Sequence, residues 1–224
     1  DRISEFDNLT FVYTDRQTSG RGRLDRQWID SGEDNLFLTI VIKPLKNISD
    51  TEIYPAFTQY LSVILCLLLE EDYNLKPQIK WPNDVLINNR KVAGILAEGI
   101  YHGTTFNGMA LGIGINLNTT THNLAMIDKP ATSIRHETGA EINKLDFLKR
   151  LQTKFCLLYD NYTEKGFISV KQLYLERAIF LGKNISINVL GKVHKGIVKG
   201  ISDTGALILN ENNNENIYYI GDIL

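Results

Sequence analysis

The sequence predicts an α+β fold: a central mixed β-sheet flanked by helices and followed by a small C-terminal β-barrel. Three observations carry this prediction. Strand-like runs dominate the first half of the chain, two segments have the apolar spacing of helices, and after Leu181 short strands alternate with glycine or asparagine turns. We therefore expect a main domain over residues 1–178 and a small barrel domain over residues 179–224.

The strands of the central sheet are expected on both sides of an arginine-rich segment. The runs LTFVYT (Leu9–Thr14) and NLFLTIVI (Asn35–Ile42) bracket that segment, which is therefore predicted to be a loop at the sheet edge. The segment Ile79–Gly99 is typical of three strands, joined by a tight turn at Pro82–Asp84 and by an Asn-Asn-Arg hairpin turn. A further strand follows the next glycine turn, at Gly103.

The helices are predicted from capping signals and apolar spacing. Ser49–Glu52 is a capping-box pattern, and the nearly all-apolar segment that follows it to about Glu70 predicts a deeply buried helix. A second helix is expected over Lys144–Glu164, and a third through Val170–Ala178.

The barrel domain has about 45 residues, too few to be more than marginally stable alone, so we expect it to dock on the main domain. The polar tract Asn210–Asn216 is interpreted as a hairpin loop between two of its strands.

Composition excludes some classes of protein. The chain has 224 residues with a formal charge of −2, which argues against a general nucleic-acid binder because such proteins carry a basic face. The longest apolar run, Leu61–Leu69, falls short of the roughly 20 residues that cross a bilayer. Cys66 and Cys156 lie in helical patterns without metal-ligand spacing, so both are expected to be reduced core residues. We expect a cytoplasmic protein without nucleic-acid or membrane partners.

The segment TSGRGRLDRQW, Thr18–Trp28, points to an anion. Four arginines fall between Arg16 and Arg26 in a chain whose charge is otherwise balanced. Guanidinium forks bind carboxylate or phosphate oxygens bidentately, and the two glycines leave backbone N–H groups open to the same anion. The alternative is a solvated basic turn, but neither glycine nor tryptophan favours one. Trp28 would stack on a purine, form an apolar wall, or belong to the core.

The pentapeptide KWPND places Lys80, Asn83 and Asp84 around the turn at Pro82. A lysine and an aspartate this close can hold a triphosphate and its Mg²⁺, since magnesium accepts one or two carboxylates plus phosphate oxygens. A capped turn with an ion pair is the alternative interpretation.

Two further strands carry candidate site residues. In RKVAGIL, an ammonium that points inward at Lys91 is costly unless it meets an anion. In GIGINLN, Gly112 and Gly114 leave one face of a strand bare, so another group can approach its backbone closely.

Together these motifs resemble biotin protein ligases. GRGRLDRQW, KWPND, RKVAGIL and GIGINLN stand in the family's order, before a C-terminal barrel that ends in GDI, so the resemblance spans nearly the whole chain. It implies a class II synthetase-like fold with an SH3-like C-terminal barrel. It also implies an ATP-dependent enzyme that forms biotinyl-5′-AMP and pyrophosphate, and then transfers biotin to a lysine of a biotin carboxyl carrier domain.

The resemblance assigns roles residue by residue. Lys91, Arg21 and Asp84 would be catalytic, and Asp84 would also be nearest to Mg²⁺. Biotin and the adenylate would be bound by Gln17, Gly20, Arg21, Gly22, Arg23, Lys91, Gly94, Ile95, Gly112 and Gly114. ATP would be bound by Arg26, Trp28, Lys80, Asn83 and Asn116, and Ala131–Ile134 would border the adenine site.

The implied cofactors are ATP and Mg²⁺, with biotin as substrate. The implied protein partner is the carrier domain of a biotin-dependent carboxylase, and a homodimer is left open. The family's Ser-Thr-Asn segment, which binds the biotin ureido ring, does not precede DRISEF. Either upstream residues are missing, which we expect, or recognition of the ureido ring is incomplete. Asp25 stands where the arginine loop commonly has glycine. No N-terminal helix-turn-helix is present, so the DNA-binding repressor form is not supported.

Two alternatives remain open at this point. One is a lipoate or octanoate ligase or transferase of the same fold, against which the GRGR loop and the barrel weigh. The other is a non-catalytic biotin-binding module, against which the intact Lys91, Arg21 and Asp84 argue.

Overall fold

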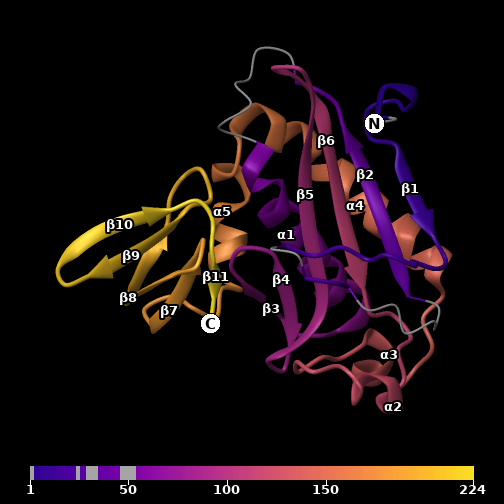
Figure 1. Cartoon of the computed structure of the whole chain (residues 1–224). Helices are drawn as coiled ribbons and strands as arrows, with labels where there is room; N and C mark the ends of the chain where they lie inside the picture. Colours follow the sequence, from indigo (N-terminus) through magenta and orange to yellow (C-terminus); the bar gives the residue numbers. More distant parts are fainter. Residues whose placement is uncertain (1–2, 24–25, 29–34, 46–53) are drawn as a thin grey trace.

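The computed structural model describes residues 3–23, 26–28, 35–45 and 54–224. A large six-stranded sheet forms the centre of the molecule, and a smaller five-stranded sheet lies beside it (Figure 1). In the large sheet the strands follow the order β1-β2-β6-β5-β4-β3. Their bounds are β1 Phe11–Thr14, β2 Leu36–Ile42, β3 Pro77–Lys80, β4 Asp84–Ile87, β5 Arg90–His102 and β6 Thr105–Ile115.

The α+β class is confirmed, but the prediction of a mixed sheet is wrong. Every ladder between the described strands of the large sheet is antiparallel. The reason lies in the connections: β3 to β6 follow one another through short turns, and such turns join only antiparallel neighbours. Asn88 and Asn89 form one of these turns with φ of 52° and 59°, a conformation that asparagine tolerates well.

Helices cover one face of the large sheet, as Figure 1 shows for α1 and α4. The predicted long helices are confirmed as α1 (Phe57–Tyr73), α4 (Lys144–Lys165) and α5 (Ile168–Leu175). Short segments add η1 (Ile3–Glu5), η2 (Tyr54–Ala56), α2 (Thr121–Leu124) and α3 (Ile134–Thr138). The predicted capping box, Ser49–Glu52, lies outside the described residues. None of the helices in the described part of the chain is both long and apolar enough to cross a membrane.

The core lies between this helical layer and the sheet. Cys66 on α1 is fully buried, and burial raises the pKa of its thiol. Cys156 on α4 is exposed, which corrects the expectation of two core cysteines. The reason is helical phase: the buried stripe of α4 runs through Leu151, Phe155 and Tyr159, and Cys156 lies one position outside it.

The opposite face of the large sheet has no bulky side chains along part of β6. Leu111 and Ile113 of β6 point into the core. The intervening positions are the small residues Ala110, Gly112 and Gly114, so this part of the sheet presents backbone and not bulky side chains. The bare strand face predicted from the glycines is present.

The smaller sheet corresponds to the predicted SH3-like barrel. Its strand order is β10-β9-β8-β7-β11, with antiparallel ladders throughout. The bounds are β7 Asn184–Val189, β8 Lys192–Ile201, β9 Leu207–Glu211, β10 Asn214–Tyr218 and β11 Asp222–Ile223. The carbonyl oxygen of Gly205 fastens this sheet to the main part, because it accepts hydrogen bonds from Trp81 Nε1 at 3.1 Å and Gln59 Nε2 at 2.9 Å.

The polar tract Asn210–Asn216 is not the loop that its composition suggests. Only Asn212 and Asn213 form the turn, with φ of 51° and 68°, and the flanking residues pair in the β9–β10 ladder. Two asparagines with positive φ suffice for a two-residue hairpin turn, so the remaining polar residues extend the strands.

Candidate functional site

Two adjoining cavities lie beside the strands that carry the four motifs. The smaller has a volume of about 230 Å³ and the larger about 400 Å³. Arg21, Trp28, Gly94 and Leu96 line both cavities. The two volumes therefore share part of their lining, so molecules bound in the two cavities would lie next to each other.

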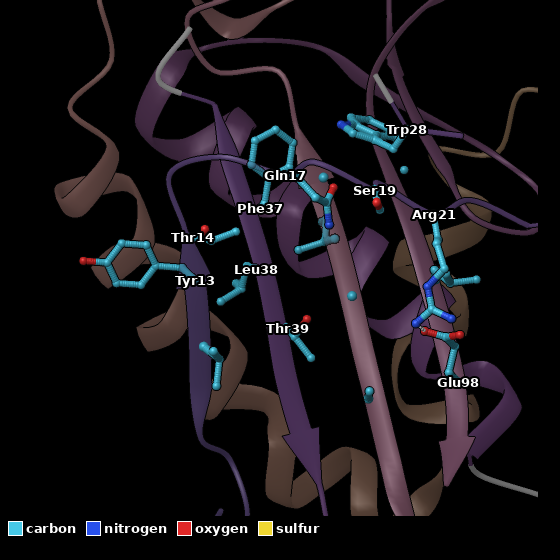
Figure 2. Close-up of a pocket in the computed structure, with 17 residues that line it drawn as sticks. Tyr13, Thr14, Gln17, Ser19, Arg21, Trp28, Phe37, Leu38, Thr39 and Glu98 are labelled. Carbon is cyan, nitrogen blue, oxygen red and sulfur yellow. Dashed lines mark hydrogen bonds and ion pairs between the residues drawn. The ribbon is translucent and has the colours of Figure 1, made fainter. Parts of the chain in front are cut away.

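The smaller cavity rests on the smooth face of the sheet. Gly112 is open to it: a Cβ added there would meet only the carbonyl oxygen of Leu96, at 3.5 Å. Figure 2 shows Thr39 on the β2 side of the cavity, and Arg21 and Glu98 facing each other on the β5 side. Arg21 Nη2 donates to Glu98 Oε2 at 3.0 Å. A neutral sheet floor beside one ion pair suits a mostly apolar ligand with a few polar groups.

The indole of Trp28 forms the shared wall. It lies over Gly94 and Gly114, which are cross-strand partners on β5 and β6. A Cβ on Gly94 would lie 2.8 Å from Trp28 Cζ3, and a Cβ on Gly114 would lie 2.6 Å from Cε2. Both positions therefore need glycine for the indole to sit here. Trp28 therefore covers the bare strand face at Gly114.

A β-bulge brings Lys91 to the same wall. The β4–β5 register shifts between Val85 and Leu86, so that two consecutive residues, Val92 and Ala93, are both fully buried. Lys91 and Gly94 then face the same side: a Cβ on Gly94 would lie 2.9 Å from Lys91 Nζ. Lys91 Nζ lies 2.6 Å from Asp84 Oδ1 and 5.3 Å from the centroid of the Trp28 ring.

Two arginines of the loop reach the smaller sheet. Arg23 Nη1 donates to the carbonyl oxygen of Gly221 and to Asp222 Oδ1, both at 3.0 Å. Arg26 Nη2 lies 2.8 Å from Asp222 Oδ2, an ion pair without the alignment of a hydrogen bond. Burial lowers the pKa of Arg23, and the charges of Asp222 and Asp84 oppose that shift. Asp222 of strand β11, whose side chain is 9% exposed, thus lines the larger cavity.

The far wall of the larger cavity is the segment 127–131. It is pinned to β5 because Lys91 N donates to the Pro130 carbonyl and Thr132 N donates to the Lys91 carbonyl, both at 2.9 Å. Asn116 holds it from the other side, since its Nδ2 donates to the Thr132 carbonyl at 3.0 Å. This wall adds Asp128 and Lys129 to the lining.

The structure brings most of the predicted site residues to these two cavities. Those lining the smaller one are Gln17, Arg21, Trp28, Gly94, Gly112 and Gly114. Those lining the larger one are Arg21, Gly22, Arg23, Arg26, Trp28, Asn83, Asp84, Lys91, Gly94, Ile95 and Asn116. Ala131, of the predicted adenine border, lines the larger cavity too.

Lys80 and Gly20 line neither cavity. Lys80 ends strand β3, which is separated from β6 by the two strands β5 and β4 in the sheet order. Gly20 lies against the backbone of Trp28, where an added Cβ would come within 2.3 Å of the Trp28 carbonyl oxygen. Asp25 lies outside the described residues.

The residues that sequence reasoning missed are mainly carboxylates that pair with the predicted cations. Glu98 meets Arg21, and Asp222 meets Arg23 and Arg26. No local pattern marks either residue, because each is far from its partner in sequence. The only available signal was the terminal GDI of the family, which contains Asp222.

The arrangement can hold a polyanion next to a largely neutral molecule. Four predicted cations, Arg21, Arg23, Arg26 and Lys91, line the larger cavity, and each has a carboxylate partner. Fixed cations of this kind stabilise charge on phosphoryl oxygens without reorganising. Within the described ranges, no three His, Cys, Asp or Glu side chains cluster as a metal site would require. Asp84 still fits magnesium, which also accepts a single carboxylate with phosphate oxygens.

Known families match both parts of the chain. The profile of the biotin/lipoate A/B protein ligase family matches residues 1–116, and that of the biotin protein ligase C-terminal domain matches residues 180–224. A biotin–[acetyl-CoA-carboxylase] ligase of Paracoccus denitrificans is 33% identical over 207 residues, which cover 89% of this chain and 83% of that protein.

Longer relatives and a solved structure extend the similarity. The bifunctional ligase/repressor BirA of Bacillus subtilis is 30% identical over 215 residues, which cover 96% of this chain. The chain spans 65% of the length of that protein. The structure of biotin protein ligase from Aquifex aeolicus in complex with biotin and ATP superposes with a TM-score of 0.82 at 25% identity, covering 100% of this chain and 92% of that one.

Proposed function

Because the chain belongs to the biotin/lipoate A/B protein ligase family, we propose that it is an ATP-dependent biotin protein ligase. It forms biotinyl-5′-AMP from biotin and ATP, and then transfers biotin to a lysine of a carrier domain. The observation that carries this proposal is the meeting of the two cavities at Trp28. A neutral cavity of about 230 Å³ and a cation-lined cavity of about 400 Å³ share this wall, as two dissimilar substrates that react require.

In the first step the biotin carboxylate attacks the α-phosphorus of ATP. A bond forms between the carboxylate oxygen and the α-phosphorus, and the bond from the α-phosphorus to the α,β-bridging oxygen breaks, so that pyrophosphate leaves with the electron pair. Like charges oppose this approach. Lys91 is assigned to this point because it lies at the shared wall, beside Asp84 and Trp28, where its ammonium can stabilise charge on the α-phosphate oxygens. Holding both substrates at one wall supplies a further part of the rate.

In the second step the carrier lysine attacks the acyl carbon of the mixed anhydride. A carbon–nitrogen bond forms, the carbon–oxygen bond to AMP breaks, and the amine loses a proton. Asp84 is our candidate for accepting that proton because its carboxylate lies in the larger cavity at the shared wall. Arg21 and Arg23 would retain the adenylate between the two steps.

The remaining residues are assigned to biotin or to ATP according to the cavity that they line. The sheet floor at Gly112 and the residues around Gln17 would hold biotin, and the Asn83–Asp84 turn with Asn116 would face ATP. Asp84 would hold Mg²⁺ together with phosphate oxygens. The ion, when bound, would neutralise part of the triphosphate charge.

The proposal also covers partners and organisation. The acceptor would be the biotin carboxyl carrier domain of a biotin-dependent carboxylase, in the cytoplasm. We propose that residues 1–178 form the catalytic domain and residues 179–224 form the barrel domain. The latter supplies Asp222 to the larger cavity.

Biotin-dependent release of pyrophosphate from ATP tests the proposed function. We expect release with biotin and little with lipoate or octanoate, measured in parallel with the same protein. Mass spectrometry of a carrier domain should then show one added biotin only when ATP is present. Release with lipoate but not with biotin would establish the alternative ligase, and biotin binding without release would establish a non-catalytic module.

A further inference from the structure

We propose that Glu137 is a positioning residue of the larger cavity. Its carboxylate ties Arg90, the neighbour of Lys91, to the segment that forms the far wall of this cavity. The inference rests on the proposed function, because it concerns how that site holds ATP. It adds a residue that touches neither substrate and lines neither cavity.

The contacts of Glu137 converge from three directions. Arg90 Nη2 donates to Glu137 Oε1 at 2.8 Å, and Asn88 Nδ2 donates to Oε2 at 2.9 Å. The Thr132 hydroxyl also donates to Oε1. Glu137 belongs to α3, Asn88 and Arg90 belong to the β4–β5 turn and the start of β5, and Thr132 follows the far wall. One carboxylate therefore joins three segments of the chain.

This junction controls the position of Lys91. Arg90 and Lys91 are consecutive, and the backbone of Lys91 is hydrogen-bonded on both sides to the far wall, through Pro130 and Thr132. A shift of Arg90 or Thr132 therefore changes the distance between the Lys91 strand and the wall that carries Asp128 and Lys129. Since the larger cavity lies between these elements, its width depends on the junction.

The chemistry of the junction requires a carboxylate. A carboxylate accepts hydrogen bonds at both oxygens and donates none, and all three partners here are donors. Glu137 is only 7% exposed, while Arg90 is 38% exposed. A glutamine in this place keeps the size of the side chain, but its NH2 group replaces one of the two acceptors, so Asn88 or Thr132 must reorient to accept a hydrogen bond from it. Loss of the charge also leaves the half-buried guanidinium of Arg90 without its ion-pair partner.

A second link extends the junction to α2. Arg90 Nη1 lies 3.3 Å from His136 Nε2, and Thr121 Oγ1 lies 3.1 Å from His136 Nδ1. The short helices α2 and α3, which no pattern in the sequence predicted, are thus held against the start of β5. Their position explains how a chain segment with little regular structure can form a defined cavity wall.

The test compares Glu137→Gln with a matched control on the other side of the molecule. The control is Glu70→Gln, because Glu70 also pairs with a partly buried arginine: Arg177 Nε donates to Glu70 Oε1 at 2.8 Å. The KM for ATP is measured at saturating biotin and the KM for biotin at saturating ATP, with the melting temperature of each variant.

We expect Glu137→Gln to raise the KM for ATP about tenfold, the size expected from a lost charge-assisted hydrogen bond, and to leave the KM for biotin within about twofold. Glu70→Gln should lower the melting temperature and leave both constants unchanged. Thr132→Val, which keeps the Arg90–Glu137 pair, should raise the KM for ATP by a smaller factor, about threefold. If Glu137→Gln does not fold, the KM for ATP of Thr132→Val tests the positioning role by itself.

The inference is overturned if Glu137→Gln and Thr132→Val leave the KM for ATP unchanged, or raise both constants equally, while wild-type protein turns over. Wild-type protein that releases no pyrophosphate with biotin would instead remove the proposed function. In that case the dissociation constant of ATP, measured by calorimetry, replaces the KM: an unchanged value in both variants rejects the positioning role, and a rise confined to these variants supports it.

Discussion

The smaller cavity takes its floor from strand backbone, whereas the larger cavity takes its walls from charged side chains on segments far apart in sequence. At Gly112 the floor is fixed by ladders to β2 and β5, which exist whatever the ligand. In the larger cavity Lys91, Arg23 and Arg26 are held by ion pairs to Asp84 and Asp222. Shape should therefore decide what the smaller cavity accepts, and charge should decide what happens in the larger one.

This difference predicts two kinds of mutational effect. A substitution that fills the smaller cavity should change affinity for one ligand and little else. A substitution that removes a charge in the larger cavity should change the rate of chemistry or the retention of an anionic intermediate.

Lys91→Ala should slow formation of biotinyl-5′-AMP by about 100-fold or more, the loss typical of a removed electrostatic contact to a developing charge. Rapid-quench measurement with labelled ATP gives this rate directly. Lys171→Ala serves as the control, because Lys171 forms an ion pair with Asp203 on the smaller sheet and lines neither cavity. A near-normal rate for Lys91→Ala would reject its assignment to the charged cavity.

Gly114→Val should affect both cavities at once. The added side chain would meet the indole of Trp28, whose Cε2 would lie 2.6 Å from the new Cβ, so the shared wall must move. Overpacking of this kind costs about 1 to 3 kcal/mol, which corresponds to about tenfold in binding. The KM values for biotin and for ATP should therefore both rise. A rise in the KM for only one substrate would mean that Trp28 does not form part of both binding sites.

Arg23→Ala should loosen retention of the adenylate. Loss of one charge-assisted contact predicts about tenfold faster release of free biotinyl-5′-AMP, measured by chromatography of the filtrate after single turnover. Arg23→Lys should give an intermediate value, because an ammonium keeps the charge but not the planar fork. Unchanged release in both variants would contradict the proposed role of the loop.

Glu98→Gln should have the smallest effect, although it also breaks an ion pair. The side chains of Arg21 and Glu98 are 73% and 40% exposed, and exposed pairs contribute about 0 to 1 kcal/mol. We expect less than about a threefold change in the KM for biotin. A tenfold change would show that charge, and not only shape, governs the smaller cavity.

Much of the fold could be predicted because its signals are local. A β-rich run located β2, the turn at Gly103 located β6, helical spacing located α1 and α4, and asparagines marked the turn at Asn88–Asn89. The short helices α2 and α3 could not be predicted, since four or five residues are too few to show periodicity. The sheet was wrongly expected to be mixed, although the short turns within Ile79–Gly99 already required antiparallel pairing.

The residues that line the cavities could be predicted to a similar extent and for similar reasons. Arginine forks and bare strand faces are visible in short motifs, so the sequence singled out Arg21, Lys91 and Gly112, which line the cavities. The carboxylates that pair with the arginines depend on tertiary contacts, since Asp222 and Arg23 are 199 residues apart in the sequence. The β-bulge that turns Lys91 toward Gly94 also depends on pairing with β4, which no single strand reveals.

The assignment of biotin to the smaller cavity and of ATP to the larger one is tested most directly by Gly112→Val. An added Cβ at this position meets only the Leu96 carbonyl oxygen at 3.5 Å, so the Cβ fits without displacing backbone or Trp28, and the two methyl groups of valine would take up space in the smaller cavity. In the pyrophosphate-release assay we predict that the KM for biotin rises about tenfold or more, while the KM for ATP at saturating biotin stays within about twofold. An unchanged KM for biotin with a raised KM for ATP would contradict the account, because it would place ATP and not biotin on the sheet floor.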